Sequence, residues 1–203
     1  MDKTILIATT NEGKAKEIAN MFSPYNFNIK TLKDFPDIVP PEEIGKTFFE
    51  NAFIKAKYYA EKTGLLSLAD DSGLEVDALN GAPGVNSAIF AGKNATDEEN
   101  NKKLLKLLEN VPEEKRTARF VCVLVLYHPS GKYIVSKGIW EGRIATSPRG
   151  QYGFGYDPLF LVKELDYKKT AAELPPEEKN KLSHRAKALK GILEKLPEFL
   201  KNI

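Results

Sequence analysis

Two adjacent aspartates, Asp70 and Asp71, are the side chains in this sequence best suited to metal or acid–base chemistry. They follow the apolar run 65–69 and precede Ser72 and Gly73. Neighbouring carboxylates repel each other unless a cation or hydrogen-bond donors compensate, and Mg²⁺ prefers carboxylate and phosphate oxygens. We therefore expect one aspartate at this strand end to hold Mg²⁺ and the other to act as a base. The alternative is a solvated turn in which an aspartate bonds to its own backbone.

A candidate phosphate site lies at residues 9–14, where an apolar run meets a helix-like segment. The segment reads Thr9-Thr10-Asn11-Glu12-Gly13-Lys14. The free backbone N–H groups at a helix N-terminus and the helix dipole favour a bound anion, and Lys14 would add a positive charge. The alternative is an ordinary capped helix with a solvated lysine.

A glycine- and aromatic-rich segment is a candidate for binding a nucleobase. It contains Phe154-Gly155-Tyr156-Asp157. Glycine lets the backbone approach a ligand closely, and an aromatic ring can stack on a base. The alternative is a tight loop whose aromatic rings fill the core.

The triplet Ser183-His184-Arg185 forms a third polar group, with Lys179 one helical turn earlier. Histidine and arginine together offer hydrogen-bond donors suited to a keto oxygen or a phosphate. The alternative is the charged outer face of an amphipathic helix.

Two further sets of residues depend on the fold for any role. The acidic pair Glu42 and Glu43 reads as a solvated loop unless the fold brings it to Asp71. Cys122 lies in an apolar strand and is expected to pack there. Because it is the only cysteine, no disulfide can form within the chain.

Strands and helices alternate along the sequence, which predicts an α/β fold with a sheet of mixed direction. We expect strands at 4–9, 65–69, 117–127 and 133–145, and helices at 11–22, 48–63, 96–108 and from Pro175 or Pro176 onward. No linker interrupts the pattern, so residues 1–203 are expected to form one domain with possible lobes.

The apolar spacing also predicts which helix faces are buried. The helix at 48–63 is expected to bury Phe49, Phe53, Ala56 and Ala60 and to end at Gly64. The final helix is expected to bury a stripe of residues: Leu182, Ala186, Leu189, Leu193 and Leu196.

The composition is that of an ordinary globular protein, with 42% apolar and 29% charged residues in 203. A net charge of +2 gives no reason to expect a nucleic-acid polymer or a membrane as partner. The N-terminus lacks the long apolar core of a signal peptide. We expect a cytoplasmic protein.

Six blocks in order closely resemble the inosine triphosphate pyrophosphatase (Ham1-like) family, over nearly the whole chain. They are Thr9-x-Asn11-x-x-Lys14, Glu43 with Thr47-Phe48-x-Glu50-Asn51-Ala52, Ala69-Asp70-Asp71-Ser72-Gly73-Leu74, Gly81-Ala82-Pro83-Gly84-Val85, Gly153-Phe154-Gly155-Tyr156-Asp157-Pro158 and Ser183-His184-Arg185. The chain departs from the family at Asn86 and Ile89, where tyrosine and arginine are frequent, and at Thr10, where glycine is frequent.

The resemblance implies an elongated mixed sheet flanked by helices, with two lobes and a central cleft. It implies a Mg²⁺-dependent enzyme that hydrolyses ITP, dITP and XTP to the monophosphate and pyrophosphate. Its role would be to remove deaminated purines from the nucleotide pool. The family is usually homodimeric.

The resemblance also implies a role for each matching residue. Residues 9–14, with Thr9, Asn11 and Lys14 foremost, would hold the triphosphate, and Ser72 would contact the substrate. Glu43 and Asp71 would coordinate Mg²⁺. Asp71 would also accept the proton of the attacking water, supported by Asp70 and Lys55. The base would meet three sets of side chains: Phe154 to Asp157, Lys179, and the pair His184 and Arg185.

Two other functions stay open on the sequence. One is a Maf-like pyrophosphatase that acts on pyrimidine or modified nucleotides, which base preference would distinguish. The other is a nucleotide-binding module without turnover, against which the intact pair Asp70 and Asp71 argues.

Overall fold

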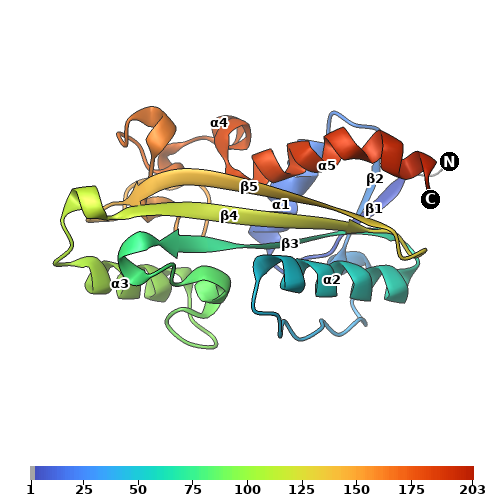
Figure 1. Ribbon diagram of the computed structural model, residues 1–203, viewed down its shortest axis with the longest axis horizontal. Helices are drawn as coiled ribbons and strands as arrows, with labels where there is room; N and C mark the ends of the chain where they lie inside the picture. The colour runs from blue at the N-terminus through green and yellow to red at the C-terminus, as the bar shows by residue number, and fades with distance from the viewer. Residues whose placement is uncertain (1–2) are drawn as a thin grey trace. The chain divides into compact units, whose positions relative to one another are not determined.

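The fold is built on one six-stranded sheet, with strand order β2-β1-β3-β4-β5-β6, in a computed structural model that describes residues 3–203 (Figure 1). The strands are β1 Thr4–Ile7, β2 Asn28–Thr31, β3 Leu66–Val76, β4 Thr117–Tyr127, β5 Tyr133–Ile144 and β6 Phe160–Val162. β1 pairs in parallel with β2 and β3, whereas β6 pairs antiparallel with β5. The predicted α/β class with a mixed sheet is therefore confirmed.

Five α-helices accompany the sheet in the described residues. They are α1 Glu12–Phe22, α2 Phe48–Thr63, α3 Asp97–Leu108, α4 Pro176–Leu182 and α5 His184–Lys201. In that same part of the chain, none of the helices combines the length and apolar character that crossing a membrane requires.

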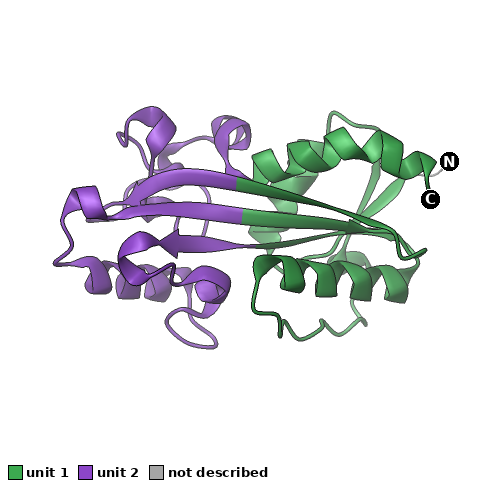
Figure 2. Cartoon of the chain, in the orientation of Figure 1, with its two compact units in different colours: residues 1–71, 122–138, 185–203 green, residues 72–121, 139–184 purple. Residues whose placement is uncertain are grey.

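The chain divides into two compact units (Figure 2). The first unit comprises residues 1–71, 122–138 and 185–203, and the second comprises residues 72–121 and 139–184. Strands β3, β4 and β5 each contribute residues to both units. The single domain 1–203 and the central cleft stay predictions.

The first unit carries helices on both faces of its part of the sheet (Figure 1). On one face, α1 and α5 pack over Leu68 of β3 and over Cys122 and Leu124 of β4. α2 covers the other face. A strand buried on both faces needs apolar side chains in both directions, which explains the uninterrupted run from Phe120 to Tyr127.

α2 has the predicted bounds because its sequence contains both end signals. The hydroxyl of Thr47 accepts a hydrogen bond from the backbone N–H of Glu50 at 3.1 Å, and Gly64 ends the helix with φ of 70°. The predicted burial of Ala56 and Ala60 is confirmed, but that of the two phenylalanines was wrong: Phe49 is 40% exposed and Phe53 is only partly buried. Ala52 and Tyr59 complete the buried face.

The shift of the α2 face has a packing cause. Alanines at every fourth position allow the helix backbone to lie close to the sheet, so this row is buried rather than the phenylalanines. Phe49 and Phe53 instead join a partly exposed aromatic cluster, in which Phe53 lies 5.0 Å from Tyr133 and 5.7 Å from Tyr127 between ring centroids.

The predicted single C-terminal helix was also wrong, because it breaks at Ser183. The backbone of Ser183 is extended (φ −67°, ψ 160°), so α4 ends before it and α5 begins after it. The break changes the phase of the helix, and Ala186 and Leu193 are only partly buried. The buried stripe of α5 consists of Ala188, Leu189, Ile192, Leu196 and Phe199.

In the second unit, the core packs α3 and the end of β4 against β5 and β6. Phe120 and Phe160 lie 4.3 Å apart between ring centroids, and Trp140 is fully buried beside them. α3 begins at the predicted capping box, in which Thr96 and Glu99 each accept the other's backbone N–H at 3.1 Å.

Candidate active site

The aspartate pair lies in the middle of a strand, which corrects the prediction of a strand end or solvated turn. β3 runs without interruption from Leu66 to Val76. Successive side chains of a strand point to opposite faces of the sheet. Asp70 therefore points to the face covered by α1 and α5, and Asp71 points to the face covered by α2. This separation reduces the repulsion that two adjacent carboxylates would otherwise feel.

Asp70 is fully buried within a set of donors. Its Oδ1 lies 2.9 Å from Nζ of Lys14, and its Oδ2 accepts hydrogen bonds from Nε of Arg185 at 3.2 Å and from Sγ of Cys122 at 2.9 Å. Burial alone would raise the pKa of Asp70, but Lys14 and Arg185 outweigh it and hold the pKa well below its usual range. Asp70 is therefore a permanent anion suited to fixing cations.

Arg185 is an internal ion-pair partner in the first unit. Arg185 is 2% exposed, and its Nη1 pairs with Oε2 of Glu17 at 2.6 Å. His184, in the second unit, is 5% exposed and stacks on Phe120 with ring centroids 4.8 Å apart. The expectation of a charged outer helix face was therefore wrong for both residues. Their contact with a base stays a prediction.

Asp71 has the properties of a proton acceptor. It is 7% exposed, and its Oδ2 has no hydrogen-bond partner in residues 3–203. Burial raises the pKa of Asp71 to about 6, against the opposing charges of Lys55 and Lys14. A carboxylate with this pKa is ionised at neutral pH and still basic enough to take a proton.

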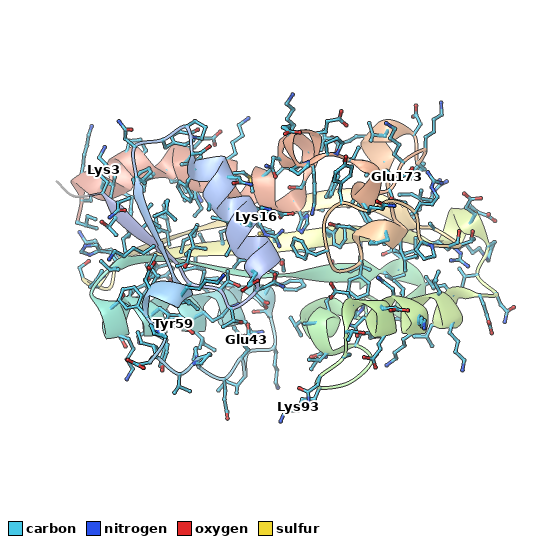
Figure 3. All side chains as sticks on the ribbon, turned by 180° about the vertical axis from the view of Figure 1, so that it is seen from behind. Lys3, Lys16, Glu43, Tyr59, Lys93 and Glu173 are labelled. Atoms are coloured by element: carbon cyan, nitrogen blue, oxygen red, sulfur yellow. The ribbon has the colours of Figure 1, made fainter. Side chains whose placement is uncertain are left out.

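Lys55 brings the acidic loop to the aspartate pair. Its Nζ donates to the backbone carbonyl of Asp70 at 2.5 Å and pairs with Oε1 of Glu43 at 2.8 Å. The side chain of Glu43 is 48% exposed and lies on the side of the sheet that α2 covers (Figure 3). The fold thus brings Glu43 close to the aspartate pair, as a metal-binding role for this residue requires. Its neighbour Glu42 is exposed.

The buried Asn51 is a residue whose role the sequence reasoning missed. It is 4% exposed, its Oδ1 accepts the backbone N–H of Gly45 at 2.8 Å, and its Nδ2 donates to the carbonyl of Gly45 at 3.3 Å. These two bonds fix the end of the loop that carries Glu43. The signal in the sequence is the Glu50-Asn51 pair of the second family block, because the apolar spacing alone predicts a buried face that does not include Asn51.

The donor set fits a magnesium ion. In the described residues no three side chains of His, Cys, Asp and Glu gather at one point. Mg²⁺ commonly takes only one or two protein carboxylates and completes its shell with water and substrate phosphates. The buried, unpartnered Oδ2 of Asp71 and the accessible carboxylate of Glu43 suit this mode of binding.

The turn at residues 9–14 is shaped by its own side chains. Oγ1 of Thr9 accepts the backbone N–H of Asn11 at 3.1 Å, and Oδ1 of Asn11 accepts that of Lys14 at 3.1 Å. Lys14 is not a solvated lysine, because it pairs with the buried Asp70. Thr10 and Glu12 are exposed, and Glu12 pairs at 3.2 Å with Lys33, which lies just after β2.

In the second unit, the loop 153–157 is held in a left-handed turn at two glycines. Gly153 and Gly155 have φ of 72° and 61°, which other residues adopt with strain. Oδ2 of Asp157 accepts the N–H of Phe154 at 3.1 Å and a hydrogen bond from Nζ of Lys179 at 2.7 Å. The same Nζ lies 4.8 Å from the centre of the Phe154 ring.

The two aromatic residues of this loop differ in exposure. Tyr156 is buried, and its hydroxyl donates to the carbonyl of Ser87 at 2.6 Å, so it fills the core as the alternative proposed. Phe154 is partly exposed, and its contact with a base stays a prediction. Ser72 follows Asp71 in β3 and is partly buried.

Comparison with known proteins identifies the family. The model of the Ham1 family matches residues 5–195, and the chain therefore belongs to the Ham1 family. This confirms the resemblance found in the six sequence blocks.

Several relatives and solved structures are similar over nearly their full length. The chain is 52% identical over 190 residues to the dITP/XTP pyrophosphatase of Desulforamulus reducens, with 94% of each chain covered. It is 54% identical over 185 residues to that of Geobacter sulfurreducens, covering 91% of this chain and 92% of the relative. The structure of a HAM1 protein from Coxiella burnetii matches with a TM-score of 0.85 at 44% identity, covering 96% and 98% of the two chains.

Proposed function

We propose that this chain hydrolyses dITP, XTP and ITP to the nucleoside monophosphate and pyrophosphate. The observation that carries the proposal is Asp71, a buried carboxylate with an unpartnered oxygen and a pKa of about 6, set beside Lys55 and Lys14. The dITP/XTP pyrophosphatases that are about half identical to the chain over nearly its whole length support the choice of substrates.

The chemistry follows from the charges of the first unit. Water attacks the α-phosphorus, and its proton passes to Asp71 as the new P–O bond forms. The bond from the α-phosphorus to the bridging oxygen breaks, and pyrophosphate leaves with the electron pair. Lys14, Lys55 and the backbone N–H groups that begin α1 offset the negative charge of the phosphates. Asp70 positions Lys14 by its ion pair of 2.9 Å.

Glu43 and Asp71 are the residues that would hold Mg²⁺. When bound, the ion supplies positive charge to the phosphate oxygens. Lys55, which pairs with Glu43 at 2.8 Å, holds that carboxylate in place for the ion.

The base is assigned to the second unit and to the triplet at Ser183. Phe154 provides a ring for stacking, and Asp157 and Lys179 brace its loop. Inosine and xanthosine have a keto oxygen at position 6, where adenosine has an amino group. Donors from His184 or Arg185 aimed at that oxygen would reject adenine, because unpaired buried donors are costly.

The first experiment is a turnover panel over dITP, XTP, GTP, ATP and dTTP with Mg²⁺. Products are separated by chromatography, so that monophosphate with pyrophosphate is distinguished from diphosphate with phosphate. We expect dITP and XTP to give monophosphates, and ATP to react at least 100-fold more slowly, on the order of the discrimination that matched polar groups provide.

The other outcomes of the panel overturn the proposal in different ways. If dTTP were the preferred substrate, the chain would be a Maf-like pyrophosphatase instead. Binding of dITP without turnover of any nucleotide would show a binding module.

The metal assignment has its own test. We expect EDTA to stop turnover and added Mg²⁺ to restore it. Glu43→Gln keeps the size of the side chain and removes its charge, so we expect it to raise the Mg²⁺ concentration needed for half-maximal rate about tenfold, with little change in melting temperature because Glu43 is half-exposed. An unchanged magnesium requirement in this variant would remove Glu43 from the site.

The proposal extends to assembly and compartment. We infer a homodimer from the family resemblance, and light scattering on the purified chain checks it, since the mass of one chain is 22.7 kDa. An enzyme that clears the nucleotide pool would act in the cytoplasm, where that pool lies. Fractionation of cells that produce the chain tests this placement.

A further inference from the structure

The loop that carries Phe154 is tied to α3 at one peptide group. The backbone N–H of Gly155 donates to Oδ2 of Asp97 at 2.9 Å, and the carbonyl of Gly155 accepts a hydrogen bond from Nδ2 of Asn101 at 3.0 Å. Asp97 and Asn101 are four residues apart, so they lie on the same face of the helix. Together they satisfy both polar groups of Gly155.

This tie is needed because packing does not hold that side of the loop. A cavity of about 380 Å³ lies between α3 and the loop, and Asp97, Asn101 and Phe154 all line it. A side-chain carbon built on Gly155 would meet nothing within 4 Å. Gly155 has a φ of 61° and open space beside it, so the two hydrogen bonds to α3 hold its peptide in addition to the turn bonds between Asp157 and Phe154.

The partners of the loop are themselves fixed. The capping box of Thr96 and Glu99 sets the first turn of α3, which fixes Asp97. On the other side of Gly155, the neighbouring Tyr156 is anchored by its hydroxyl to Ser87 at 2.6 Å. The helix therefore has the rigidity to determine where the Phe154 ring lies.

We propose that Asp97 and Asn101 are positioning residues that place the Phe154 loop through the Gly155 peptide and so set the affinity of the chain for the purine base; this rests on the proposed function. Neither residue touches the phosphates or reacts. They hold the base-binding loop in its binding conformation before the nucleotide binds.

Asn101→Leu is the most specific test of the hydrogen bond between α3 and Gly155. In residues 3–203, Oδ1 of Asn101 has no hydrogen-bond partner and Nδ2 donates to the carbonyl of Gly155. Leucine has nearly the same shape, so the substitution removes this one described side-chain hydrogen bond. Loss of one such bond typically weakens binding about five- to tenfold. We expect the KM for dITP to rise by this factor while kcat stays within about twofold.

Four companion measurements distinguish a positioning role from general damage to the fold. Asp97→Ala should raise the KM in the same way, whereas Asp97→Asn keeps an oxygen acceptor for Gly155 and should restore it. Lys106→Ala, at an exposed position of the same helix that does not line the cavity, is the matched control, and its KM and kcat should equal those of the wild-type chain. Inorganic triphosphate, which has no base, should inhibit all variants equally.

Hydrogen exchange tests the tie without any turnover. Amides of residues 153–157 should exchange faster in Asn101→Leu and Asp97→Ala, and at the wild-type rate in Lys106→Ala. Unchanged exchange and an unchanged KM in Asn101→Leu would overturn the inference, and so would an equal loss of affinity for inorganic triphosphate. If the unchanged chain turns over no nucleotide, the proposed function fails, and exchange with titration of IMP still decides whether α3 sets base affinity.

Discussion

Replacement of Asp71 by asparagine is expected to lower the turnover of dITP about 10³-fold and, in the same protein, to raise its melting temperature. The loss of rate follows because asparagine cannot accept the proton of the attacking water, and general-base catalysis is typically worth 10²- to 10⁴-fold, as an order of magnitude. It also removes one of the two carboxylates assigned to Mg²⁺.

The gain in stability comes from the buried charge. The pKa of Asp71 is raised from 3.8 to about 6, mainly by burial. Above pH 6 Asp71 is ionised in both states, and its charge is less favourable in the folded state than in the unfolded state. This difference lowers the free energy of unfolding by about 2–3 kcal/mol. Asparagine removes this cost. For a chain of this size we expect a melting temperature about 5–10 °C higher at pH 7.5.

The effect of Asp71→Asn on stability depends on pH. Because the pKa is higher in the folded state, the stabilisation from proton binding is complete below the unfolded value of 3.8 and is lost as the pH rises through about 6. The gain from Asp71→Asn should therefore appear in metal-free protein at pH 7.5 and vanish near pH 4. Thermal melts in EDTA across this range measure it. Equal melting temperatures at pH 7.5 would contradict the assigned burial cost.

The neighbouring substitution Asp70→Ala is expected to have the opposite effect on stability. It leaves the guanidinium of Arg185 and the ammonium of Lys14 without the buried carboxylate that they share. Removing one partner of a buried pair typically costs about 3–5 kcal/mol. We expect the melting temperature to fall by about 10 °C or more.

A surface pair provides the control for Asp70. Asp77 also pairs with an arginine, at 3.0 Å from Arg119, but its side chain is 46% exposed. Asp77→Ala should therefore cost less than about 1 kcal/mol. The pKa of Asp70 is lowered in the folded state, so its stabilisation is present above the unfolded value of 3.8 and is lost only as the pH falls through its folded value. The cost of Asp70→Ala should stay constant from pH 8 to about 5, and a cost equal to that of Asp77→Ala would contradict the buried network.

Elements with local signals could be predicted from the sequence. α2 and α3 begin and end as expected because Thr47, Gly64, Thr96 and Glu99 act within a few residues of themselves. The long pair of β4 and β5 could also be predicted, because β4 is almost continuously apolar, β5 alternates buried and exposed residues, and the turn between them is polar. In each case the residues that decide the structure are neighbours in the chain.

Features set by distant partners could not be predicted. β3 continues through Asp70 because Lys14, Cys122 and Arg185 compensate a buried charge, and these residues come from three other elements. The same holds for Asn51, whose partner Gly45 lies before the helix that carries it. The break at Ser183 has no proline or glycine to announce it.

The alternation of β3 has a consequence for accuracy. Donors from three elements hold the Asp70 carboxylate, and a single planar peptide joins Asp70 to Asp71. Lys55 donates a hydrogen bond to the carbonyl of that peptide. Planarity fixes the peptide itself, and the pairing of β3 with β1 and β4 restrains the dihedral angles on either side of it. The position of the Asp71 carboxylate, the proposed proton acceptor, therefore depends directly on its neighbour Asp70, which donors from α1, β4 and α5 hold.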